Sequence, residues 1–130
     1  MSHVIALVDD LMFLSRIREA ARGCGAVVRT ARAAGDLVAG AREGAHLVLV
    51  DADSARLPWA DAVRALRSEA PFAALPVVAF VSHVHPERAE AARAAGCSRV
   101  LARGAFVQEL PRLLATATAT TATADTPEEN

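Results

Sequence analysis

Apolar and polar residues follow two alternating periods along this chain. Five short runs are nearly all apolar, and after each of them apolar residues recur at helical spacing. Short continuous apolar runs are typical of strands buried on both faces, as in a parallel sheet. The predicted strands are His3–Val8, Ala26–Thr30, His46–Val50, Pro76–Val81 and Ser98–Ala102. The predicted helices are Leu11–Arg22, Gly35–Glu43, Ala60–Ala70, the segment from Pro86 to just before Gly96, and about Ala105 to Ala115.

This alternation predicts an α/β domain in which helices cover both faces of a five-stranded parallel sheet. Gly23 is expected to end the first helix, because glycine adopts the left-handed conformation at helix C-termini. Pro111 should kink the last helix or delay its start, because proline has no N–H to donate. Residues 116–130 are polar, alternate mainly between Thr and Ala, and have no apolar face, so we expect a disordered low-complexity tail. The domain should therefore span residues 1–115.

The composition excludes several classes of function. Apolar residues make up 53% of the 130 residues, yet no run reaches the roughly 18 apolar residues of a membrane span. The N-terminus lacks a basic region leading into an apolar one, so a cytoplasmic protein is expected. The formal net charge is −1, and residues 1–114 carry 14 basic against 12 acidic side chains, so nucleic-acid binding is not expected. All 14 basic residues are arginine, and the lack of lysine excludes P-loop and Schiff-base chemistry.

Cysteine and histidine do not suggest a disulfide or a metal site. Cys24 and Cys97 lie 73 positions apart and neither belongs to a CxxC motif, so both are expected to be reduced thiols. The four histidines do not recur at the spacing of helical metal ligands.

Acidic, hydroxyl and cationic residues follow the predicted strands at the points where the strands end. They are Asp9 and Asp10 after the first strand, Asp51 and Asp53 after the third, Ser82 after the fourth and Arg103 after the fifth. The carboxyl ends of parallel strands meet at one edge of an open sheet, where such folds place their sites. Clustered carboxylates need a cation, and Mg²⁺ prefers oxygen ligands. This edge is therefore expected to hold Mg²⁺ and to support attack of a carboxylate on phosphorus.

In these residues the chain resembles the receiver domains of two-component response regulators, the CheY-like family. The resemblance covers residues 3–115 and depends on Val8-Asp9-Asp10, Leu47–Asp51, the serine after PVVAFV and the arginine after SRVLA. It implies a doubly wound, flavodoxin-like sheet of strand order 2-1-3-4-5. It also implies that Asp51 is the phosphoacceptor, that Ser82 is the switch hydroxyl and that Arg103 occupies the position of the family's lysine.

The resemblance further implies a metal site and partners. The expected Mg²⁺ site consists of the acidic pair Asp9 and Asp10, with Asp51 and the main-chain carbonyl of Asp53. A sensor histidine kinase or a phosphotransfer protein would phosphorylate Asp51, and the new charge would change the affinity for a downstream protein target. The expected function is that of a stand-alone bacterial response regulator in a phosphorelay, which is not an enzyme and acts through protein–protein contact.

Three positions depart from the family's pattern. The family has lysine followed by a cis proline after the fifth strand, whereas this chain has Arg103-Gly104. The family has Met-Pro soon after the phosphoacceptor, whereas here the first proline is Pro58, and Val100 stands where the switch aromatic is expected. Arg103 could clamp phosphoryl oxygens, or it could lock onto Asp51 and Asp10 in place of the metal.

Other interpretations stay open at this point. A pseudo-receiver would bind its partners without phosphorylation. The run Asp51-Ala52-Asp53-Ser54 also resembles the nucleophile motif of haloacid-dehalogenase-type phosphatases, which would make the protein a small phosphohydrolase. Aspartate is moreover a favoured N-cap, so Asp9 and Asp10 could simply cap the first helix.

Overall fold

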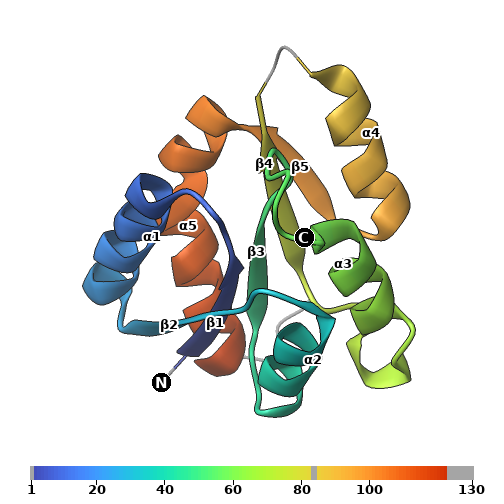
Figure 1. Ribbon diagram of the computed structural model, residues 1–130. Helices are drawn as coiled ribbons and strands as arrows, with labels where there is room; N and C mark the ends of the chain where they lie inside the picture. The colour runs from blue at the N-terminus through green and yellow to red at the C-terminus, as the bar shows by residue number, and fades with distance from the viewer. Residues whose placement is uncertain (1, 83–84, 123–130) are drawn as a thin grey trace, which may run out of the picture.

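The computed structural model describes residues 2–82 and 85–122, with side chains as far as residue 115, and within them five parallel strands form one sheet in the order β2-β1-β3-β4-β5 (Figure 1). The strands are β1 (Ser2–Leu7), β2 (Ala26–Thr30), β3 (Leu47–Asp51), β4 (Val77–Val81) and β5 (Arg99–Ala102). The helices are α1 (Leu11–Cys24), α2 (Ala34–Arg42), α3 (Trp59–Arg67), α4 (Pro86–Ala95) and α5 (Arg103–Ala122), with a 3-10 turn η1 (Ala70–Phe72) after α3. The α/β class and the strand order are thereby confirmed.

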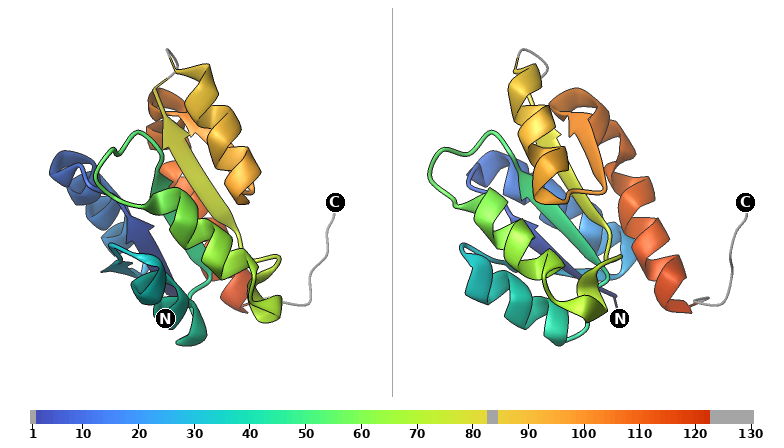
Figure 2. Two further views of the ribbon diagram at one scale, coloured as in Figure 1. Left: turned by 45° about the vertical axis from the view of Figure 1, so that its right-hand side comes forward. Right: turned by 90° about the vertical axis from the view of Figure 1, so that its right-hand side faces the viewer.

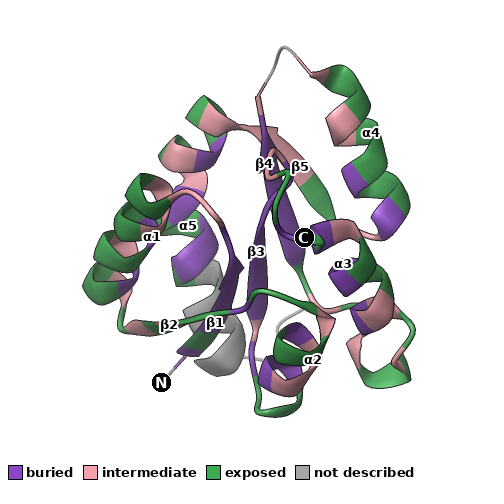
Figure 3. Ribbon diagram, in the orientation of Figure 1, coloured by how far each residue is buried: buried purple, intermediate pink, exposed green. Residues whose placement is uncertain are grey.

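The sheet lies between two layers of helices, with α1 and α5 on one face and α2, α3 and α4 on the other (Figures 1 and 2). Successive side chains of a strand point to opposite faces. In β1, Ile5 and Leu7 therefore pack beneath α2–α4, while Val4 and Ala6 pack beneath α1 and α5. All residues of β3 and β4 are buried (Figure 3). Burial on both faces is the physical reason why these strands are continuous apolar runs in the sequence.

The register of the sheet brings the carboxyl ends of the strands to one edge. Leu7 of β1 pairs with Val50, Asp51 of β3 pairs with Phe80, and Val81 of β4 pairs with Ala102. The residues that follow these positions therefore start from neighbouring points on the sheet. This places the acidic, hydroxyl and cationic residues of the sequence together.

Two helix ends differ from the sequence-based expectation. Helix α1 runs through Gly23 to Cys24, and Gly25 is the residue that adopts the left-handed conformation, with φ 71°. Either glycine can take that conformation, and the start of β2 one residue later selects the second. Helix α3 ends at Arg67, earlier than expected, because Pro71 lies inside the separate turn η1 rather than terminating α3.

Helix α5 starts at Arg103 and continues to Ala122, so Pro111 does not delay its start. The helix extends into the segment that was expected to be disordered, where alanine, the strongest helix former, is frequent. Residues 123–130 lie outside the described residues. None of the helices in the described part of the chain combines the length and apolar character needed to cross a membrane.

Candidate functional site

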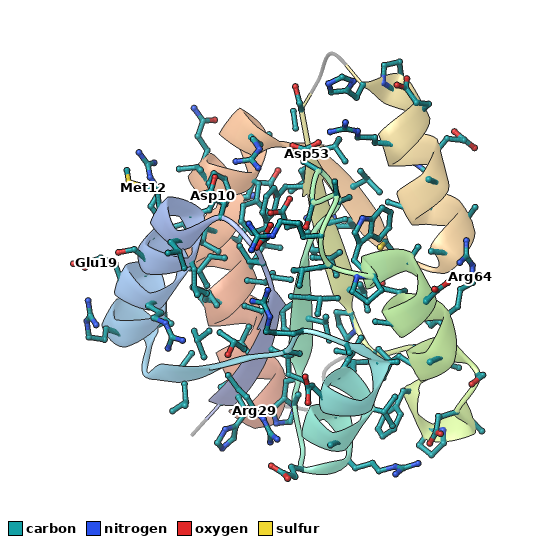
Figure 4. All side chains as sticks on the ribbon, in the orientation of Figure 1. Asp10, Met12, Glu19, Arg29, Asp53 and Arg64 are labelled. Atoms are coloured by element: carbon teal, nitrogen blue, oxygen red, sulfur yellow. The ribbon has the colours of Figure 1, made fainter. Side chains whose placement is uncertain are left out.

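The carboxyl edge of the sheet forms an open cleft of about 290 Å³. The side chains that line it are acidic, small or cationic: Asp9, Asp10, Asp51, Asp53, Ser54, Ala55 and Arg103. Asp10 and Asp53, which come from different loops, both lie at this edge in Figure 4. The structure therefore brings the expected acidic residues and Arg103 into one site, and Ser82 joins them through its main-chain N–H.

Asp51, the last residue of β3, is the most buried acid of the site, with 2% of its surface exposed. Its Oδ1 atom accepts a hydrogen bond from the Asp53 N–H at 3.1 Å, and Oδ2 accepts one from the Asp9 N–H at 3.4 Å. Burial raises the pKa of the Asp51 carboxyl above its usual value, and these N–H groups and the Arg103 charge only partly oppose that effect. The carboxylate is thus desolvated, but it is oriented by main-chain N–H groups from its own loop and from the loop after β1.

The guanidinium group of Arg103 lies among three carboxylates, those of Asp10, Asp51 and Asp53. Its Nε lies 2.9 Å from Oδ2 of Asp53, its Nη1 lies 3.4 Å from Oδ2 of Asp10, and its Nη2 lies 3.7 Å from Oδ1 of Asp51. Burial lowers the pKa of Arg103, but the hydrogen bond to Asp53 and the charges of Asp51 and Asp53 more than compensate, so the net shift is upward. The cation is therefore held firmly in its charged form.

An aromatic floor supports this guanidinium from below. The Cζ atom of Arg103 lies 4.7 Å from the centre of the Phe13 ring and 5.1 Å from that of Phe80. The two rings lie 4.4 Å apart, and Phe106 packs 4.7 Å from Phe80. A planar guanidinium can present its face to aromatic rings while the N–H groups at its edge point toward carboxylates, a geometry that differs from the point charge of a lysine ammonium. The site thus uses properties that are specific to arginine at position 103.

Asp10 has two roles in this arrangement. Its Oδ1 atom accepts from the N–H groups of Met12 and Phe13 at 2.9 and 3.2 Å, which makes Asp10 the N-cap of α1. The Phe13 N–H is the main reason why the pKa of Asp10 is lowered. Its other oxygen faces Arg103. The capping interpretation of Asp10 is therefore confirmed, and the same side chain also faces the cleft.

Asp9 faces two exposed arginines at the rim of the cleft. Nη2 of Arg32 lies 3.9 Å from Oδ1 of Asp9, and Nε of Arg56 lies 3.7 Å from Oδ2. Ser54 Oγ is a further neighbour, 3.5 Å from Oδ2. Both arginine side chains are mostly exposed, so each pair contributes little to stability, although both add positive charge to the rim.

Asp53 is bound through its side chain by three different segments. Oδ1 accepts from the Ser82 N–H at 3.0 Å and from Nη1 of Arg88 at 3.1 Å, and Oδ2 accepts from Nε of Arg103 at 2.9 Å. Burial alone would raise its pKa, but these hydrogen bonds outweigh it and the pKa is lowered. The resemblance to receiver domains implied a role for the main-chain carbonyl of Asp53, whereas these three contacts involve its carboxylate.

The geometry of the cluster fits a guanidinium rather than a divalent cation. The carboxylates meet as expected for a Mg²⁺ site, but Arg103 lies among them and both oxygens of Asp10 are engaged. In residues 2–82 and 85–122, no group of three or more His, Cys, Asp or Glu side chains is arranged to hold a metal ion. The Mg²⁺ site therefore stays a prediction of the sequence.

Several contributors to the site were not anticipated. Arg32, Arg56 and Arg88 come from separate loops and helices, and Phe13 and Phe80 are spaced as ordinary core residues. A local signal exists only near Arg88, because Pro86, two residues before it, predicts the start of α4.

Val100 lies on β5, is half-buried and packs against the α2–α4 side of the core.

The sequence matches no protein-family model, and no curated protein matches it. Solved structures are similar to it in fold. One is the receiver domain of the sensor histidine kinase PA1611 from Pseudomonas aeruginosa PAO1, whose structure has a magnesium ion coordinated in its active-site cleft. It is 21% identical to this chain, with a TM-score of 0.75, and the match covers 91% of this chain and 98% of that one. The chemotaxis response regulator CheY4 of Vibrio cholerae is 19% identical with a TM-score of 0.72, over 90% and 98% of the two chains. A putative response regulator from Chloroflexus aurantiacus is 18% identical with a TM-score of 0.75, over 91% and 98%. This chain has the CheY-like receiver-domain fold of response regulators.

Proposed function

We propose that this protein is a receiver-type signalling module that acts through protein–protein contact and does not require phosphorylation of Asp51. The observation that carries the proposal is the position of Arg103, whose three nitrogens lie 2.9–3.7 Å from the carboxylates of Asp53, Asp10 and Asp51. Arginine keeps its charge at all physiological pH values, so it is a permanent counter-ion for these acids.

The charge balance of the cluster supports this proposal. In the described part of the chain, each of the four carboxylates faces at least one guanidinium group, and four guanidinium groups take part, so the formal charges cancel. A divalent cation binds to an excess of carboxylate charge. In a balanced cluster that excess is missing, and a metal ion would have to compete with Arg103 for the same oxygens.

The residue at the position of the switch aromatic also supports phosphorylation-independent output. Val100 is half-buried against the α2–α4 side of the core. A valine cannot exchange a large ring between solvent and core, so the expected readout of phosphorylation on this surface is missing. A valine at this position is consistent with a partner-binding surface that does not change on phosphorylation.

A phosphorylatable receiver is the second candidate function, and the position of Asp51 favours it. Asp51 ends β3 and lines the open cleft. In this mechanism a carboxylate oxygen of Asp51 attacks the phosphorus of a phosphohistidine on a sensor kinase or phosphotransfer protein. The P–N bond breaks, and the imidazole leaves. Arg103 would turn from Asp51 to the new phosphoryl oxygens, with which it can form paired hydrogen bonds.

The phosphohydrolase interpretation is not supported by a comparable observation. A role of Asp53 in acid–base catalysis beside Asp51 would require its carboxylate to take up a proton. Its carboxylate instead accepts hydrogen bonds from Ser82, Arg88 and Arg103, which stabilise the charged form and oppose proton uptake.

Incubation with acetyl phosphate, followed by intact-protein mass spectrometry, separates the two candidates. We expect no phosphoryl adduct on the wild-type protein at any Mg²⁺ concentration. An adduct that forms on the wild type and is absent from Asp51→Asn would overturn the proposal and establish the second candidate. Trp59, the only tryptophan of the sequence, starts α3 just beyond the Asp51 loop, so its fluorescence offers an independent measure of Mg²⁺ binding.

A further inference from the structure

We propose that the carboxylate of Asp53 takes the structural place of a phosphoryl group in this domain, joining the ends of β4 and β5 to α4 and holding α4 in one position. This role of Asp53 rests on the proposed phosphorylation-independent function, since α4 would keep one position without a phosphoryl group on Asp51. Asp53 is then a positioning residue that acts through Ser82, Arg88 and Arg103.

Asp53 contacts three segments that are far apart in the sequence. Its carboxylate accepts from the Ser82 N–H at 3.0 Å, from Arg88 at 3.1 Å and from Arg103 at 2.9 Å. These donors lie 29, 35 and 50 positions away in sequence, at the end of β4, in α4 and at the start of α5. Only 12% of the Asp53 side chain is exposed, so charged hydrogen bonds here are stronger than surface ion pairs.

A phosphoryl group on Asp51 would need partners that Asp53 already binds. Such a group would present anionic oxygens at this edge of the sheet, where a cation after β5 and a donor after β4 would hold them. The Asp53 carboxylate already engages Arg103 after β5 and Ser82 after β4. Asp53 also lies directly against Asp51, because its N–H donates to Asp51 Oδ1 at 3.1 Å. A phosphoryl group would thus compete with Asp53 for the same partners.

Helix α4 has few large apolar side chains to attach it to the core. Among its described residues, those buried are the alanines Ala92 and Ala95, with Ala89 packing at the margin of the core. Alanine side chains remove little apolar area from water, so the hydrophobic attachment of α4 is small. Arg88 therefore supplies a polar anchor that reaches from α4 to Asp53. Loss of this anchor should affect α4 more than helices attached by larger side chains.

Hydrogen–deuterium exchange of the full-length protein tests the proposal. Asp53→Asn keeps the shape of the side chain but removes the charge that Arg88 and Arg103 bind, while Arg88→Gln removes the anchor from the α4 side. Asp61→Asn is the matched control, because Asp61 is an exposed acid of α3 that pairs with Arg64 on the surface. We expect amide exchange in α4 to accelerate by about tenfold in Asp53→Asn and in Arg88→Gln, as expected for the loss of one charged hydrogen bond. The control should match the wild type.

Unchanged α4 exchange in either variant would overturn the proposal. Equal acceleration in α1, α2 and α4 would also overturn it, since this would reveal a general loss of stability rather than a local anchor. The proposed function fails on a different result, the appearance of a phosphoryl adduct on wild-type Asp51. The two failures are therefore distinguishable.

Discussion

Nε of Arg103 lies 2.9 Å from Oδ2 of Asp53, whereas Nη2 of Arg103 lies 3.7 Å from Oδ1 of Asp51. The shortest contact of the central cation is thus with the residue two positions beyond the expected phosphoacceptor. Asp51 instead accepts hydrogen bonds from the main-chain N–H groups of Asp9 and Asp53. Asp53 thus contacts both groups, the cation through its carboxylate and Asp51 through its main-chain N–H.

Replacement of Arg103 by lysine should create affinity for Mg²⁺. The ammonium group is compact, so it can face fewer of the carboxylates at once and frees oxygens of Asp10 and Asp51. We expect saturable Mg²⁺ binding in Arg103→Lys and none in the wild type, measured by Trp59 fluorescence. Arg112→Lys is the control, since Arg112 is exposed on α5. Identical titrations of Arg103→Lys and wild type would count against a counter-ion role for Arg103.

The aromatic floor should be energetically coupled to the guanidinium. Phe13→Leu removes a ring that lies 4.7 Å from Arg103 Cζ. In a double-mutant cycle with Arg103→Gln, measured by chemical denaturation, we expect a coupling energy of about 1 kcal/mol, as found for partly desolvated cation–π pairs. Additive effects of the two substitutions would show that the ring and the cation are merely neighbours.

The contributions of Asp53 and Asp51 to the stability of the fold should change with pH in opposite directions. The pKa of Asp53 is lowered in the folded protein, because hydrogen bonds from Ser82, Arg103 and Arg88 outweigh burial. Its contribution is therefore present above the ordinary value of 3.8 and is lost as the pH falls through the folded value. Asp53→Asn should be less stable than wild type near pH 7, by about 2 kcal/mol for the lost charged hydrogen bonds. The deficit should shrink as the pH approaches about 3.

For Asp51 the sign reverses. Burial raises its pKa, so its contribution is present below the ordinary value of 3.8 and is lost as the pH rises through the folded value. Asp51→Asn should therefore gain stability relative to the wild type as the pH increases. Denaturation of both variants across this pH range provides the measurement, and parallel pH profiles of the two variants would refute this assignment.

Two glycines at the end of α1 should respond in opposite ways to alanine. Gly25 has φ 71°, a conformation that alanine adopts only with strain, so Gly25→Ala should cost about 1 kcal/mol. Gly23 lies inside the helix and has open space where a Cβ would be placed, so Gly23→Ala should stabilise the protein by about 0.5–1 kcal/mol. Thermal denaturation of the pair gives the comparison, and a stabilising Gly25→Ala would contradict the observed helix end.

The amino-acid sequence determined the layers of this fold and the edge at which its polar residues meet. Continuous apolar runs such as Leu47–Val50 are typical of strands buried on both faces, and their alternation with helical patterns predicted a parallel sheet between helices. Because parallel strands end at the same edge, Asp10, Asp51 and Arg103 were expected to meet there.

Tertiary structure decided which atoms of that edge contact one another. The Arg103 guanidinium lies 4.7 Å from the centre of the Phe13 ring and 2.9 Å from Asp53, two contacts that hydrophobic periodicity does not encode. The partnership of Arg88 with Asp53 spans 35 positions and depends on how α4 packs, which no local pattern encodes. Periodicity reports which face of an element is buried, whereas the direction of a long charged side chain depends on every neighbour within a few ångströms.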